Sequence, residues 1–157
     1  MSLKQKITVL LTVFLPVCLI DRITKLWAQR YLAQTIKKDF LQGFLGWHYT
    51  RNTGIAFSMF SSSALPVIAS FLIVAFVLTA IFRMKGLKIP SCAALCMIAA
   101  GGACNLFDRL LTGYVIDFIE LQFVRFAIFN VADIFVCIGA VLLIIRILVG
   151  EEKKDEA

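Results

Sequence analysis

The sequence is poor in charged residues, and this scarcity decides its class. Only 17% of its 157 residues are charged, whereas 61% are hydrophobic and the mean hydropathy is +0.90. Soluble domains carry about 25% charged residues, so the composition excludes a water-soluble fold. About twenty apolar residues cross the hydrocarbon core as a helix, and the length therefore allows roughly four membrane spans with short loops.

Histidine and paired cysteines are equally scarce. His48 is the only histidine, and no CxxC pair occurs among the five cysteines, all of which fall in apolar runs: Cys18, Cys92, Cys96, Cys104 and Cys137. Neither zinc nor disulfides find support in this pattern, and we expect the cysteines to be packing residues. No sequence feature marks a partner for His48 that would activate a serine or cysteine nucleophile. We expect no metal and no organic cofactor.

The basic residues flank apolar segments rather than forming a polar face. A net charge of +6 would otherwise suggest nucleic acid, which this placement excludes as a partner. Residues 1–6, 83–88 and 150–157 hold seven lysines and arginines in twenty positions, against six in sixty for residues 29–65 and 108–130. Positive flanks stay on the cytoplasmic side, so both termini should be cytoplasmic and the two longer loops should face outward.

The apolar runs predict an all-α integral membrane protein, a single domain over residues 1–157. We expect a four-helix transmembrane bundle with spans at about 7–28, 66–82, 89–107 and 133–149 and outer loops at 29–65 and 108–132. Within the first loop, residues 40–60 have β-branched and aromatic residues between Gly43, Gly46 and Gly54, which favours a small β-containing element.

The spans differ in composition. The first resembles a cleavable signal peptide, but its apolar run continues past Asp21 without a small-x-small cleavage site, so we expect it to be retained. The second, from Pro66 to Phe82, is uncharged and is interpreted as a plain anchor. The third contains the small residues 99–103, which allow close helix contact in lipid, and we place it at a helix interface.

Acidic residues in or beside a span are costly and need a partner or a function. Asp21 has Lys25 at i+4 on the same helical face, which predicts an ion pair. Asp108 is followed by Arg109 and preceded at i−3 by Asn105, which suggests a neutralised cluster bracing the third helix. A structural role is the simpler interpretation for both acids.

Asp117 and Asp133 differ from the other two acids because no basic residue lies within four positions of either. Two carboxyls brought together in a poorly solvated place cannot both ionise, so the pair holds one proton. One member can then activate water while the other donates a proton. Capping of the fourth helix is an alternative role for Asp133, and Glu120 is interpreted as a solvated interface residue.

Two other functions use the same acids. Asp108, Asp117 and Asp133 could hold Mg²⁺ in a metal-dependent phospholipid headgroup transferase, although such sites usually place several aspartates on adjacent helical turns. A small transporter or channel subunit would use the acids as an ion path across the membrane. The inner halves of the spans are apolar, which disfavours such a path.

Four ordered blocks give the sequence a family resemblance. DRITK at 21–25, RNTGIAFS at 51–58, GGACNLFDRLLTGYVIDFI at 101–119 and FNVADIFVCIGAVLL at 129–143 resemble the bacterial lipoprotein signal peptidases, or type II signal peptidases. The resemblance implies an intramembrane aspartic endopeptidase of the bacterial cytoplasmic (inner) membrane. It would remove the signal peptide from diacylglyceryl-modified prolipoproteins, before the lipid-modified cysteine, with its active site near the outer face.

The resemblance also implies roles for particular residues. Asp117 and Asp133 match the catalytic pair. The positions matching the substrate-binding residues are Asn52, Asn105, Arg109 and Asn130, and those matching structural support are Asp21, Lys25, Gly54 and Asp108, the last bracing Arg109. The expected partners are prolipoprotein substrates and membrane lipid, and we expect a monomer.

Overall fold

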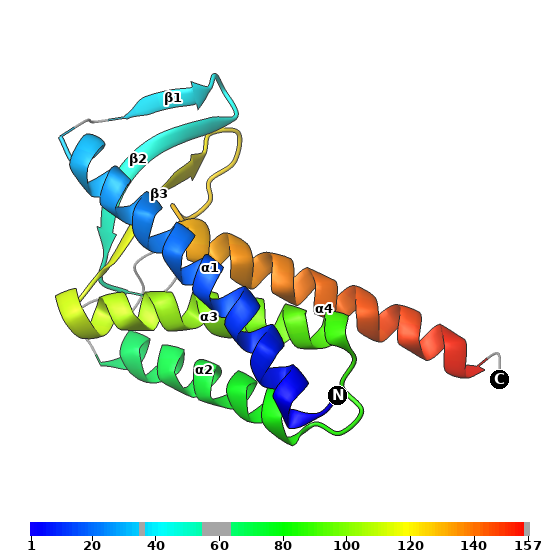
Figure 1. The fold of residues 1–157 in the computed structure, drawn as a ribbon. Coiled ribbons are helices and arrows are strands. Elements are labelled where there is room, and N and C mark those ends of the chain that lie inside the picture. Colours follow the sequence, from blue (N-terminus) through cyan, green and yellow to red (C-terminus); the bar gives the residue numbers. More distant parts are fainter. Residues whose placement is uncertain (35–36, 55–63, 156–157) are drawn as a thin grey trace.

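Four long helices and a three-stranded sheet make up the fold in a computed structural model that describes residues 1–34, 37–54 and 64–155 (Figure 1). The helices are α1 (Leu3–Tyr31), α2 (Leu65–Arg83), α3 (Ile89–Thr112) and α4 (Val131–Asp155). Each is long and apolar enough to cross a membrane. The predicted fold class is therefore confirmed, and the chain is a multi-pass membrane protein. The helices extend beyond most of the predicted spans, so Asp108 and Arg109 lie in the last turns of α3.

The sheet is antiparallel with the order β1-β2-β3. Strands β1 (Lys38–Leu41) and β2 (Leu45–Asn52) form the predicted element, and the turn between them contains Gly43 at φ +74°. Strand β3 (Val115–Leu121) lies in a segment that we expected to be loop. Its apolar VIDFIEL sequence pairs with β2, which is distant along the chain, so a local pattern could not reveal the pairing.

Helix α3 is the centre of the bundle. Half of its most apolar stretch is buried, against 11% to 22% in the other helices. A Cβ at Gly101 would collide with the carbonyl oxygen of Ala132, and one at Gly139 would come within 2.6 Å of the carbonyl oxygen of Ala94. The two glycines therefore allow the backbones of α3 and α4 to approach closely. This confirms the predicted interface on α3 and adds Gly139, which we had not singled out.

A hydrophobic cluster joins the sheet to α1. Ala28 of α1 and Leu32, which directly follows that helix, pack with Ile116 and Phe118 of β3. The Trp27, Trp47 and Phe118 rings stack or meet edge to face. Since side chains alternate along a strand, Ile116 and Phe118 face α1 while Val115 and Asp117 face the other way. This alternation directs the Asp117 carboxyl away from α1.

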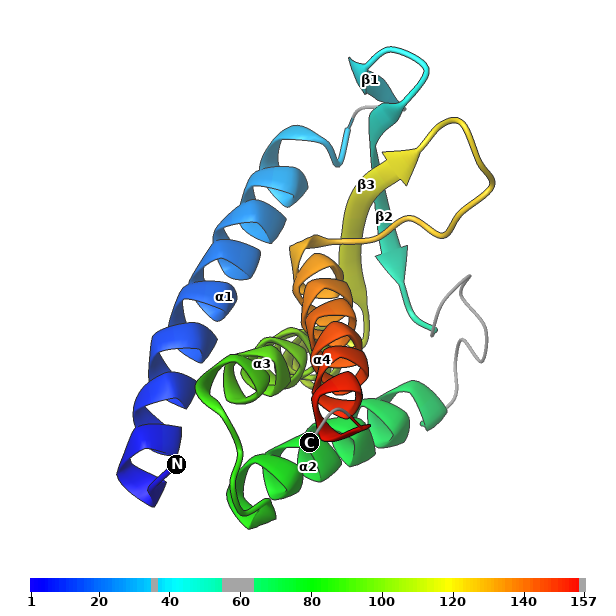
Figure 2. The same cartoon turned by 90° about the vertical axis from the view of Figure 1, so that its right-hand side faces the viewer.

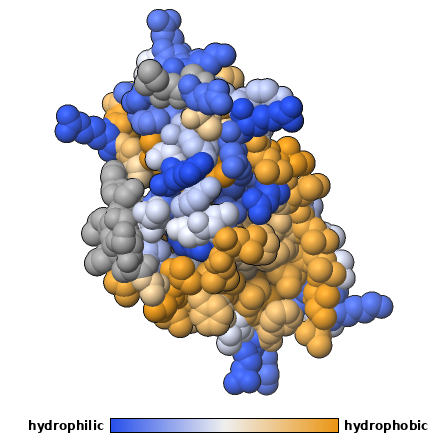
Figure 3. Space-filling model, turned by 90° about the vertical axis from the view of Figure 1, so that its left-hand side faces the viewer, coloured by the Kyte–Doolittle hydropathy of each residue, from blue (hydrophilic) through white to orange (hydrophobic). Residues whose placement is uncertain are grey.

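The sheet lies at one end of the bundle, and residue 1 and the end of α4 lie at the other (Figures 1 and 2). On the face shown in Figure 3, hydrophobic side chains cover much of the helical surface, whereas hydrophilic residues gather toward the sheet and at the opposite tip. This distribution is typical of a protein whose helices contact lipid along most of their length.

Candidate active site

Asp117 is positioned by the register between β2 and β3. Asn52 pairs with Val115, two residues before Asp117, so the Asn52 and Asp117 side chains are diagonal neighbours on one face. Asn52 Nδ2 donates to Asp117 Oδ2 at 2.9 Å. Phe129 bonds to the backbone of Phe118 and Ile119, which brings the next residue, Asn130, beside the strand. Asn130 Nδ2 donates to Asp117 Oδ1 at 2.7 Å, so both oxygens of this carboxyl have an amide donor.

Asp133 stands in the first turn of α4. The backbone N–H of Asn130 donates to Asp133 Oδ2, and the backbone N–H of Asp133 donates to Asn130 Oδ1, both at 3.1 Å. These reciprocal bonds have the form of a capping box at a helix N-terminus. Asn105 Nδ2 of α3 donates to Asp133 Oδ1 at 2.8 Å. The capping role that we considered for Asp133 is therefore real, and it fixes the carboxyl in place.

The two carboxyls converge on Asn130. This residue is fully buried and bonds to Asp117 through its side chain and to Asp133 through its backbone. Its Nδ2 also donates to Asn105 Oδ1 at 3.2 Å. Asp117 is 2% exposed, whereas Asp133 is only partly buried. The acids thus lie in one hydrogen-bonded group, in which Asp133 is the less buried member.

The electrostatics of Asp117 favour retention of a proton. Burial raises its pKa to about 6, and the negative charge of Asp133 acts in the same direction, against the amide donors of Asn52 and Asn130. Neither acid has an ion pair among the described residues. Two interacting carboxyls without a direct ion pair share protons more readily than isolated ones.

Lys25 forms the centre of an ion cluster behind the acids. Its fully buried Nζ lies 2.8 Å from Asp21 Oδ2, 2.7 Å from Asp108 Oδ2 and 2.9 Å from Asn105 Oδ1. Because the Asn105 oxygen accepts from Lys25, the NH₂ group of that amide faces Asp133. The predicted Asp21–Lys25 ion pair is confirmed. Asp21 Oδ1 also accepts the N–H of Ala132 at 3.0 Å, so α1 helps to cap α4.

The expected contact between Asp108 and Arg109 is wrong. Asp108 pairs with Lys25 and, at 3.5 Å, with Arg22. Consecutive residues on a helix project about 100° apart, so Asp108 faces α1 while Arg109 faces another side. Adjacency in sequence was misleading here, and the i−3 relation to Asn105 was the informative one.

Arg109 is held by α2 and by the segment after β2. Its Nη1 donates to Ser70 Oγ at 3.4 Å and to the Asn105 carbonyl at 3.3 Å, and its Nη2 donates to the Gly54 carbonyl at 2.9 Å. The Gly54 N–H in turn donates to Asn52 Oδ1 at 2.9 Å. Helix α2 is therefore more than a plain anchor, because Ser70 contributes to the site. Arg109 Nε is buried and has no acceptor among the described residues.

His48 has a partner that the sequence did not indicate. Its Nδ1 lies 3.4 Å from Glu120 Oε1, which also accepts from Lys37 at 2.8 Å. Glu120 is thus an ion-paired residue rather than a freely solvated one. All five cysteines are free. Among residues 1–34, 37–54 and 64–155, no group of three His, Cys, Asp or Glu side chains could hold a metal ion.

Fold and site together define a multi-pass membrane protein with an amide-lined pair of carboxyls at one end of its helices. A family model described as signal peptidase (SPase) II matches residues 13–149. The lipoprotein signal peptidase of Streptococcus pyogenes serotype M6 is 34% identical over 137 residues, covering 87% of this chain and 90% of that protein. Its counterpart from serotype M5 is 36% identical over 127 residues, covering 80% and 84%.

Two solved structures, both described as a bacterial membrane enzyme studied by the in meso method, share the fold. One, at 2.3 Å resolution, has a TM-score of 0.79 and 26% identity and covers 99% of this chain and 94% of its own. The other, at 1.9 Å, has a TM-score of 0.73 and 27% identity, with coverage of 93% and 94%. The chain belongs to the signal peptidase II family and is a peptidase of the aspartic type. The resemblance is confirmed, and neither alternative function finds support.

Proposed function

We propose that Asp117 and Asp133 are the catalytic pair of this peptidase. The substrate is a prolipoprotein, and the bond cleaved precedes its diacylglyceryl-modified cysteine. The observation that carries the proposal is the convergence of both carboxyls on Asn130, where neither is neutralised by a described cation. The names of the curated relatives support a lipoprotein substrate.

The chemistry follows from one proton on the pair. The ionised carboxylate accepts a proton from water as the water oxygen attacks the peptide carbonyl, and the protonated carboxyl donates to the carbonyl oxygen. Collapse of the tetrahedral intermediate breaks the C–N bond, and the amine leaves with a proton from the pair. The raised pKa of Asp117 makes it the member better suited to carry the initial proton.

Polar groups around the pair can hold an extended peptide. Arg109 Nε has no acceptor among the described residues, so the Arg109 guanidinium can donate to a substrate carbonyl once the peptide has displaced what covers it, and Asn52, Asn105 and Asn130 orient the acids and the peptide. Asp21, Lys25, Asp108 and Gly54 support these residues from behind. We also expect the outer segment 40–60 to cover the site and exclude bulk water; its residues 55–60 lie outside the described residues.

The arrangement also supports a topology. The basic flanks occur at residues 1–6 and 83–88, away from the sheet, so both termini are cytoplasmic and the acids lie near the outer face of the inner membrane. The donors found for both acids already lie within this chain, so the proposed pair needs no second copy, and we retain the expectation of a monomer.

The test is cleavage of a lipid-modified precursor by purified enzyme. Asp117→Asn and Asp133→Asn should each lower kcat by at least about 10³-fold, because each removes a proton-transfer group. Glu120→Gln is the matched control, since Glu120 lies on the same strand but pairs with Lys37, and it should keep near-normal cleavage. Undiminished cleavage by both aspartate variants would refute the proposal.

A further inference from the structure

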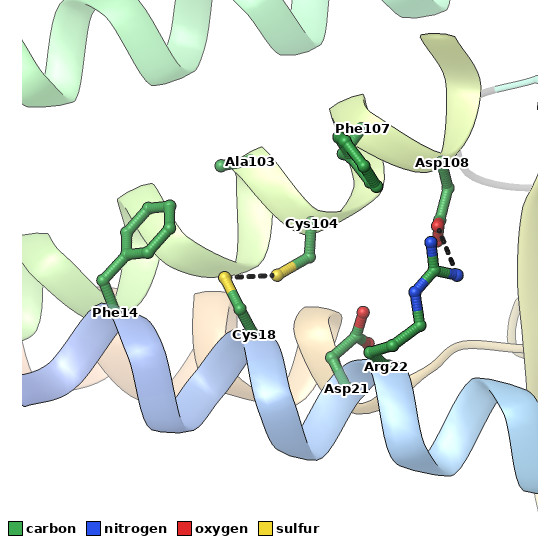
Figure 4. A pocket seen from close by; sticks show the side chains of 8 residues that line it. All are labelled: Phe14, Cys18, Asp21, Arg22, Ala103, Cys104, Phe107 and Asp108. Carbon is green, nitrogen blue, oxygen red and sulfur yellow. Dashed lines mark hydrogen bonds and ion pairs between the residues drawn. The ribbon is translucent and has the colours of Figure 1, made fainter. Parts of the chain in front are cut away.

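A crevice of about 340 Å³ lies between α1 and α3 (Figure 4). Phe14 and Cys18 of α1 and Ala103, Cys104 and Phe107 of α3 form its apolar part. The Cys104 thiol lies 3.0 Å from the Cys18 thiol across it. Asp21, Arg22 and Asp108 form its polar end. The proposed reaction makes no use of this crevice.

The depth of the crevice matches a membrane lipid. Arg22 is fifteen residues beyond Ile7, where the predicted span begins, which places its backbone about 22 Å along the roughly 30 Å of the hydrocarbon core. A long arginine side chain can extend from there toward the headgroups. Phe14 lies eight residues earlier and therefore about 12 Å deeper, so the apolar part of the crevice is at the level of acyl chains.

Arg22 is the group at the polar end that can bind a phosphate. Asp21 is engaged by Lys25 and by the Ala132 N–H, and Asp108 is engaged by both Lys25 and Arg22, so two cations balance the two acids. Arg22 is different because 42% of its side chain is exposed and its contact with Asp108 is long, at 3.5 Å. Its guanidinium lies over the Phe107 ring, 5.8 Å from the centroid, and a planar guanidinium can hold a phosphodiester through two hydrogen bonds.

We infer that this crevice binds one anionic phospholipid, with an acyl chain along Phe14, Cys18 and Cys104 and the phosphate at Arg22. The site is separate from the catalytic pair and goes beyond the proposed function. It is connected to that pair through Asp108, because Lys25 joins Asp108 to Asn105, which donates to Asp133. A lipid seated there would contact the structural support of the acids.

Native mass spectrometry of the full chain, with dioleoyl phosphatidylglycerol or dioleoyl phosphatidylcholine added to the micelles, tests the inference. The wild type should retain one phosphatidylglycerol about fivefold more strongly than phosphatidylcholine. Arg22→Gln should abolish that preference, whereas Arg30→Gln, which removes the same charge from the same helix over Tyr31, should keep it. Ala103→Leu fills the crevice and should weaken retention of both lipids.

Equal retention of the two lipids by the wild type overturns the inference, and so does an unchanged preference in Arg22→Gln. Unchanged retention in Ala103→Leu would place the lipid elsewhere. A melting curve for each variant shows whether it is folded. None of these measurements involves peptide cleavage, so their failure leaves the proposed function intact.

Discussion

Lys25 is the residue whose loss should affect this protein most severely without touching the reacting groups. Lys25→Met removes three contacts of 2.7 to 2.9 Å and leaves the Asp21 and Asp108 carboxyls buried without their shared cation. Removing one partner of a buried ion pair costs about 3 to 5 kcal/mol. At about 2 to 4 °C for each kcal/mol in a chain of this length, the melting temperature should fall by about 6 to 20 °C.

Arg22→Gln is the matched control, because Arg22 also pairs with Asp108 but is 42% exposed and 3.5 Å away. An exposed pair contributes at most about 1 kcal/mol, so this variant should melt within a few degrees of the wild type. The double variant Lys25→Met/Asp21→Asn leaves one buried carboxylate without its cation instead of two, so it should recover part of the loss in melting temperature. Melting is measured by intrinsic fluorescence in detergent. The reasoning fails if Lys25→Met and Arg22→Gln melt at the same temperature.

Three further results are expected. Burial raises the pKa of Asp117 to about 6, so its protonated form exists below that pH and is lost above it, and kcat/KM should fall about tenfold per pH unit on the alkaline side. Asn52→Ala removes a hydrogen-bond donor to the carboxylate and should move this fall to higher pH. A move to lower pH would contradict the assignment. Gly101→Ala should cost about 1 to 3 kcal/mol of stability and lower cleavage, because the new Cβ meets the Ala132 carbonyl beside Asp133. In Gly102→Ala the new Cβ meets only a Val74 methyl at 3.0 Å, so the same melting and cleavage assays should show a small loss. EDTA should leave cleavage unchanged, and loss of activity that Mg²⁺ restores would revive a metal-dependent mechanism.

Local sequence features predicted the helices and the choice of acids. Runs of apolar residues marked all four helices, and the lack of basic neighbours separated Asp117 and Asp133 from Asp21 and Asp108. These are properties that a short segment carries by itself. The i,i+4 spacing of Asp21 and Lys25 belongs to the same kind and was equally informative.

Local sequence features could not predict contacts between segments that are distant along the chain. Strand β3 exists because β2 pairs with it, and the bond from Asn52 to Asp117 depends on that register. Asp108 has its partners on another helix, although a basic residue follows it in the sequence. The family resemblance supplied candidate roles for these positions, but only the packing of α1 against α3 and α4 shows which groups meet.

The bond from the Ala132 N–H to Asp21 Oδ1 has a consequence for biogenesis. Within this sequence α1 precedes α4 and supplies an acceptor for its N-terminus, so the arrangement around Asp133 is incomplete until α4 has been made and packed. The proposed catalytic pair can therefore assemble only once these two helices have met in the bilayer.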